Sequence, residues 1–107
     1  MKQLHVTELS RWLSEPETEQ PQLLDVREPW EVVTAGFPGA LNIPMGAITA
    51  RFHELDRNRP LVCICHHGAR SMQVAYFLAR QGFDPIYNLV GGIHAWACEV
   101  DPSCPTY

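Results

Sequence analysis

The sequence lacks any long apolar stretch, and this absence excludes several classes of protein. Its apolar runs are far shorter than the roughly 20 residues that a membrane-spanning helix needs. The first residues, Met-Lys-Gln-Leu-His-Val, are not followed by the apolar segment of a secretory signal. We therefore expect no membrane contact and a location in the cytoplasm.

Charge is also scarce. Charged residues make up 19% of the 107 residues, the formal net charge is -4, and no run of Lys or Arg occurs. Nucleic acid is not an expected partner, because phosphate contacts need a basic face. The apolar fraction of 46% is enough for one core and argues against disorder. We expect a single domain over residues 1–107, with its core at about 4–98 and an irregular tail over 99–107.

Cysteine is limited to four positions, Cys63, Cys65, Cys98 and Cys104. In a cytosolic chain with a good core, free thiols are expected rather than disulfides. Cys63 and Cys65 lie two positions apart on a predicted strand, so they share a face and do not bridge easily. A zinc site that combines them with His66 and His67 lacks the usual ligand spacing. We expect neither a metal nor a cofactor.

Strand and helix patterns alternate along the chain. Thr7 is an acceptable N-cap for a first helix, and a tail without regular structure begins at Asp101. Strands are predicted at 22–26, 41–43, 61–65 and 86–89, and helices at 29–33, 48–55, 69–81 and from 91–92 onward. The run 61–65 is apolar throughout, which is typical of a central parallel strand. The sequence predicts an α/β fold: a mostly parallel sheet of about five short strands with helices on both faces.

The segment 65–71 joins the central strand to the clearest helix. A helix N-terminus exposes unpaired N–H groups and the positive end of its dipole, and a tight turn entering it can cradle an anion. Gly68 permits the backbone angles of such a turn, and Arg70 adds a permanent positive charge. A cysteine in that setting ionises readily. We interpret Cys65 as a reactive thiolate at the start of an anion-cradling loop.

Each of these residues also has a simpler structural interpretation. Cys63 lies mid-strand among apolar neighbours and is interpreted as a small buried hydrophobic residue. His66 and His67 are each better explained singly as exposed loop residues than as catalysts, although the pair can extend the positive field of the loop. Arg70 fits either a surface position in the first helical turn or an anion-binding role, and its place in the loop favours the latter.

Four ordered sequence blocks resemble the rhodanese family of sulfurtransferases and span nearly the whole chain. They are Leu23-Leu24-Asp25-Val26-Arg27-Glu28-Pro29, Phe37-Pro38-Gly39-Ala40-Leu41-Asn42-Ile43-Pro44, Cys65-His66-His67-Gly68-Ala69-Arg70-Ser71 and Asn88-Leu89-Val90-Gly91-Gly92-Ile93-His94-Ala95-Trp96. The family often has a His after Gly36, where this chain has Phe37. The resemblance implies a single rhodanese-like domain.

The resemblance also implies a chemistry. Family members take a sulfane sulfur from a donor such as thiosulfate onto the loop cysteine, here Cys65. The persulfide then passes that sulfur to cyanide or a thiol, with covalent ping-pong catalysis. Loop N–H groups over residues 66–71 would stabilise the persulfide, and Arg70 would help to bind the anionic donor.

Other matched residues are expected to support the fold. Asp25 and Arg27 match an Asp-x-Arg element beside the active site, and a structural salt bridge is favoured over direct chemistry. The turn at 91–92 and Trp96 are interpreted as packing elements. Cys104 lies between prolines in a tail expected to be exposed, where an idle thiol is favoured over one that resolves the persulfide.

Two other functions stay open as alternatives. The domain could be a persulfide carrier fed by a partner protein, or a regulatory binding module with little turnover of free donor. Phosphatase or arsenate reductase activity is disfavoured, because those enzymes use Cys-x5-Arg, whereas Cys65 and Arg70 form Cys-x4-Arg. The shorter loop suits a terminal sulfur atom better than a phosphate.

Overall fold

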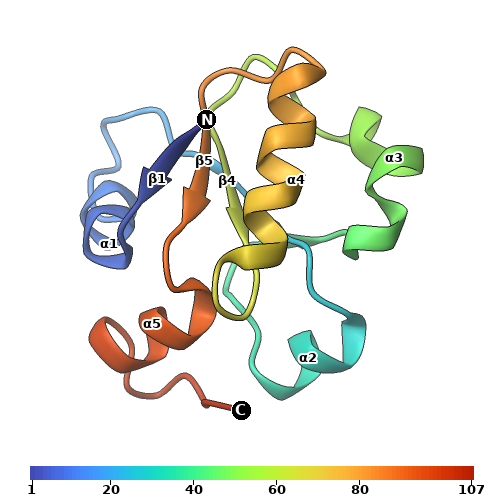
Figure 1. Ribbon diagram of the computed structural model, residues 1–107. Coiled ribbons are helices and arrows are strands. Elements are labelled where there is room, and N and C mark those ends of the chain that lie inside the picture. The colour runs from blue at the N-terminus through green and yellow to red at the C-terminus, as the bar shows by residue number, and fades with distance from the viewer.

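A computed structural model describes all residues from 1 to 107 (Figure 1). One sheet of five strands, all parallel, lies at its centre, in the order β1-β5-β4-β2-β3. The strands are β1 (Lys2–Leu4), β2 (Gln22–Asp25), β3 (Leu41–Asn42), β4 (Leu61–Ile64) and β5 (Ile86–Leu89). The predicted central strand is therefore confirmed as β4, which pairs with β2 on one side and β5 on the other.

Helices cover both faces of the sheet, as predicted. They are α1 (Val6–Leu13), α2 (Pro29–Thr34), α3 (Ile48–Arg51), α4 (Ala69–Arg80) and α5 (Gly92–Glu99), with 3-10 turns η1 (Met45–Ala47) and η2 (Phe52–Glu54). Each face carries its own apolar cluster, because successive strand residues point to opposite sides. One cluster joins the sheet to α3 and α4, and the other joins it to α1 and α5. No helix of the chain combines the length and apolarity needed to span a bilayer.

Two predicted boundaries are wrong. The first helix begins at Val6 with His5 as its N-cap, not with Thr7, because the Glu8 carboxylate accepts a hydrogen bond from the His5 amide at 3.1 Å. The helix predicted over 48–55 is α-helical only to Arg51 and continues as η2. Both differences concern local hydrogen bonding at helix ends, which apolar spacing does not report.

The tail without helix or strand begins at Val100, one residue later than predicted, because Glu99 is the last residue of α5, and it is packed rather than loose. Cys104 and Tyr107 both lie against the apolar cluster that includes Leu9, Phe37 and Trp96. The Cys104 amide donates to the Asp101 carbonyl at 3.0 Å, which turns the chain back over the domain. Cys104 is partly buried, although its neighbours Ser103 and Pro105 are exposed.

The N-terminus of α5 supports the loop that follows β4. The Ile93 amide donates to the Cys65 carbonyl at 2.9 Å, and the His94 amide donates to the His66 carbonyl at 3.1 Å. This approach requires Gly92, since a Cβ there would clash with both of those carbonyl oxygens, and its φ is +60°. The paired glycines are packing elements, as interpreted from the sequence, and what they pack against is the loop.

We expect Gly92→Ala to destabilise the protein more than Gly39→Ala does. Both glycines have positive φ, +60° and +78°, but a Cβ at Gly39 would meet nothing within 4 Å. Gly39→Ala should cost about 1–2 kcal/mol of unfolding free energy, from backbone strain alone. Gly92→Ala adds an overpacking cost of about 1–3 kcal/mol. Urea denaturation of the two variants measures the difference, and equal losses would contradict the close-packing argument.

Candidate active site

Cys65 stands directly after β4 and points its sulfur back at the loop. The Gly68 amide donates to Cys65 Sγ at 3.0 Å, and Gly68 caps α4 with a left-handed φ of 106°. The Ser71 hydroxyl lies 3.3 Å from the same sulfur. Donors of this kind stabilise negative charge on the atom they face. The residue is only 1% exposed, so the sulfur lies inside the loop rather than at the surface.

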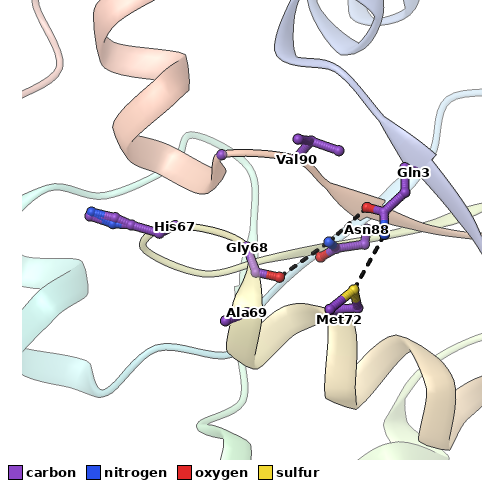
Figure 2. A pocket seen from close by; sticks show the side chains of 8 residues that line it. Gln3, His67, Gly68, Ala69, Met72, Asn88 and Val90 are labelled. Atoms are coloured by element: carbon purple, nitrogen blue, oxygen red, sulfur yellow. Dashed lines mark hydrogen bonds between the residues drawn. The ribbon is translucent and has the colours of Figure 1, made fainter.

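A chain of polar side chains braces this loop from β5 and β1. Asn88 donates to the Gly68 carbonyl at 3.2 Å and to Gln3 Oε1 at 3.0 Å, and Gln3 donates to Met72 Sδ at 3.3 Å (Figure 2). The Ser71 hydroxyl lies 2.5 Å from Asn88 Oδ1. A hydroxyl has one proton, so Ser71 can give it either to Asn88 or to the sulfur.

The pocket drawn in Figure 2 lies on the outer side of the loop. Its lining includes His67, Gly68 and Ala69 but not Cys65. His67 points away from the Gln3–Asn88–Met72 group in that view. The pocket therefore borders the loop without reaching its sulfur.

Arg27 and Asp25 form the structural salt bridge favoured from the sequence. Arg27 Nη2 lies 2.6 Å from Asp25 Oδ2, and the two side chains are 0% and 1% exposed. Arg27 also donates to the backbone carbonyls of Glu31 and Ala35 at 3.3 and 2.7 Å. These bonds tie the middle and the C-terminal end of α2 to the residues that follow β2. Removal of one partner would leave a buried charge unpaired, which is costly.

Arg70 is held by Glu31, a residue that the sequence reasoning missed. Its Nη1 and Nη2 donate to the two Glu31 oxygens at 2.8 and 2.9 Å, while its side chain stays 37% exposed. The Arg70 guanidinium lowers the pKa of Glu31 to about 2, so the pair is ionised at neutral pH. In the sequence, Glu31 is marked only by its spacing of three residues from Glu28, which is typical of a helix start. In the structure, its carboxylate accepts a hydrogen bond from the Glu28 amide at 2.9 Å. Sequence spacing does not reveal a partner on another helix.

The tail places Tyr107 next to Arg27 and Glu31, a position that sequence reasoning also missed. Its hydroxyl accepts from Arg27 Nη1 at 2.8 Å and donates to Glu31 Oε1 at 2.9 Å. Burial raises the pKa of Tyr107, so the phenol keeps its proton. Its ring stacks on His66 with centroids 3.9 Å apart and planes 3° apart. A tail of mixed composition gave no signal for this contact.

The two loop histidines are joined by a third from α5. Nitrogen atoms of His66, His67 and His94 lie within 4.8 Å of one another. Burial and the neighbouring His67 lower the pKa of His66, which reduces the positive charge expected from it at neutral pH. The zinc ligand set considered from the sequence paired these histidines with cysteines and did not include His94.

The remaining thiols differ sharply from Cys65. All four cysteines are free. Cys63 shares the sheet face of Cys65, as predicted, and burial strongly raises the pKa of its thiol. Burial also raises the pKa of Cys104, and Cys98 is exposed on α5.

Phe37 stands where the family often has a histidine. Its ring packs on that of Trp96, with the ring centroids 4.6 Å apart.

Comparisons with known proteins match this geometry to one family. The model of the rhodanese-like domain matches residues 5–99. A chloroplast protein of Arabidopsis thaliana, "Rhodanese-like/PpiC domain-containing protein 12", is 39% identical over the whole chain, which spans 38% of that protein. A protein of Allochromatium vinosum called "Sulfurtransferase" is 42% identical over 81 residues, 76% of each protein.

Solved structures agree with the sequence comparisons. A rhodanese-like domain protein from Staphylococcus aureus superposes with a TM-score of 0.84 at 31% identity, and the match covers 100% of this chain and 99% of that one. The family match covers most of the chain and includes the strand, loop and helix that carry Cys65. The protein belongs to the rhodanese-like domain family.

Proposed function

We propose that this protein is a sulfurtransferase that moves a sulfane sulfur through a persulfide on Cys65. The observation that carries the proposal is the Gly68 amide directed at Cys65 Sγ from 3.0 Å, at the N-terminus of α4. The name of the Allochromatium relative, and the family itself, support sulfur transfer as the reaction. A thiolate that accepts loop N–H bonds is suited to nucleophilic attack on sulfur.

The proposed cycle has two steps. The Cys65 thiolate attacks the outer sulfur of a donor such as thiosulfate, a new S–S bond forms, and the old S–S bond breaks as sulfite leaves with the electron pair. An acceptor nucleophile, cyanide or a thiolate, then attacks the outer persulfide sulfur. Thiocyanate or a new persulfide leaves, and the electron pair of the broken S–S bond returns to Cys65. No external oxidant or reductant is consumed.

Donor binding is assigned to the loop and to Arg70. A guanidinium has five N–H donors, and Glu31 accepts from two of them. The others are free to bind an anion, and the 37% exposure of the side chain makes them accessible. Because Cys65 is 1% exposed, the donor should be small or present its sulfur on a narrow group. Small anionic donors fit both conditions.

The reaction requires a reduced nucleophile and therefore a reducing compartment. All four cysteines are free, and disulfides are rare in the cytosol. The free thiols fit the cytosol and support our proposal that the reaction takes place in the cytoplasm. A protein that donates or accepts persulfide sulfur would use the same Cys65 and the same loop.

Treatment with thiosulfate should add one sulfur atom to the wild-type protein and none to Cys65→Ala. The reason is that the Cys65 sulfur accepts an N–H hydrogen bond at the end of β4, whereas Cys63, which is equally buried, lies within the strand. Intact mass spectrometry measures the added mass, and cyanide should remove it.

The matched control for this experiment is Cys63→Ala, which removes the other thiol of the same sheet face. That variant should still gain one sulfur. A gain that persists in Cys65→Ala would contradict the assignment of the nucleophile. A wild-type protein that takes no sulfur from thiosulfate, yet takes it from a protein persulfide, would indicate a carrier fed by a partner.

Arg70→Ala should raise KM for thiosulfate at least about tenfold, which corresponds to the loss of a charge-assisted hydrogen bond of about 1.5–3 kcal/mol. Steady-state kinetics with cyanide as acceptor give KM and kcat. Arg80→Ala, at the exposed far end of α4, is the control and should leave both constants unchanged. An unchanged KM in Arg70→Ala would assign donor binding to the backbone amides alone.

A further inference from the structure

We propose that His66, His67 and His94 form a binding site for a divalent transition metal ion, of which Zn²⁺ is the representative. Each residue offers one imidazole nitrogen, and these nitrogens lie within 4.8 Å of one another. Two of the three ligands belong to the loop that begins at Cys65, but the site does not use the cysteine sulfur. It therefore goes beyond the proposed sulfur transfer and stands whether or not that reaction occurs.

The backbone already holds two of the ligands together. The His94 amide donates to the His66 carbonyl at 3.1 Å, so the loop and α5 cannot separate without breaking this bond. The rings of His66 and His67 lie 3.9 Å apart, and those of His67 and His94 lie 5.0 Å apart. The fold thus brings side chains from positions 66 and 94 into one cluster before any ion binds.

A second observation is that one ring nitrogen of His66 lacks a hydrogen-bond partner. His66 Nε2 is buried and has no hydrogen-bond partner. A buried polar atom without a partner is costly, and a native structure with one calls for an explanation. The ring face of His66 is fixed by Tyr107, but this stacking does not satisfy the nitrogen. A metal ion would supply the missing partner.

The donor set defines the class of ion. Neutral imidazole suits Zn²⁺, Cu²⁺, Ni²⁺ and Co²⁺ rather than Ca²⁺ or Mg²⁺. With Zn–N bonds of about 2.0–2.1 Å in tetrahedral geometry, the nitrogens must approach to about 3.3 Å from one another. His67 and His94 are both exposed, and a rotation of their side chains would bring the nitrogens to that separation. Three ligands leave a fourth position for water or an exogenous thiol.

Nearby charge does not oppose a cation. The permanent positive charge near His66 is that of Arg70, and this guanidinium is paired with the two Glu31 oxygens at 2.8 and 2.9 Å. One competing arrangement involves Cys98, whose Sγ lies 3.8 Å from His94 Nε2 but outside the three-nitrogen cluster. In that arrangement His94 and Cys98 alone would chelate the ion on the surface of α5.

The test is titration of the full chain with Co²⁺, followed by visible absorption, and with Zn²⁺, followed by calorimetry. We expect one equivalent to bind, with tetrahedral cobalt bands and no thiolate-to-cobalt charge transfer in the near ultraviolet. Loss of one direct ligand in His67→Ala or His94→Ala should weaken binding at least about tenfold, since even outer partners of metal ligands change affinity by 10–100-fold. Both side chains are exposed, so both variants should fold.

Three variants serve as controls. His53→Ala removes an exposed histidine of η2 and should leave affinity unchanged, as should Cys65→Ser and Cys98→Ser. Binding that is lost in Cys65→Ser would place the ion on the reactive thiol and overturn the proposal. Binding lost in Cys98→Ser but kept in His67→Ala would favour the two-residue chelate and also overturn it. A wild-type protein that binds no metal ion at one equivalent would also overturn the proposal.

Discussion

The active-site loop depends on where its carbonyl groups point. The carbonyls of Cys65 and His66 accept hydrogen bonds from the first amides of α5, at 2.9 and 3.1 Å. On the other side of the loop, the Gly68 amide donates to the Cys65 sulfur at 3.0 Å. The start of α5 lies so close to the loop that a Cβ atom at position 92 would clash with these carbonyl oxygens. Gly92, which has no Cβ, makes this close contact possible. The last helix of the chain thus shapes the environment of a cysteine in its middle.

Cys63 and Cys65 have similar burial but different hydrogen bonding. Cys63 and Cys65 share a sheet face and the same apolar cluster, and both are almost fully buried. Cys63 has only apolar surroundings, so burial raises the pKa of its thiol. Cys65 lies one step beyond the end of β4, where backbone and hydroxyl donors reach its sulfur. The difference lies in the hydrogen bonds, since the degree of burial is nearly the same.

Glu31 joins three parts of the chain that are distant in sequence. It accepts from Arg70 on α4, from Tyr107 in the tail and from the Glu28 amide at the start of its own helix. Its backbone carbonyl also accepts from Arg27, which is paired with Asp25. Since the Arg70 pair holds the pKa of Glu31 near 2, this junction stays charged over the pH range of ordinary assays. It fixes Arg70 beside the loop while part of the guanidinium remains exposed.

The sequence alone predicted most of the elements and the cysteine that we propose as the nucleophile. The apolar run 61–65 predicted the central strand, and Cys65 at its end, followed by Gly68 and a helix, predicted the loop, because both patterns are local. Only the tertiary structure decided the partners: Glu31 for Arg70, Gly92 for the loop carbonyls, and His94 for the two loop histidines. These contacts join residues on different elements, and their geometry follows from the order of strands in the sheet and the packing of helices on it. The spacing of residues along the sequence does not indicate which residues of different elements are in contact.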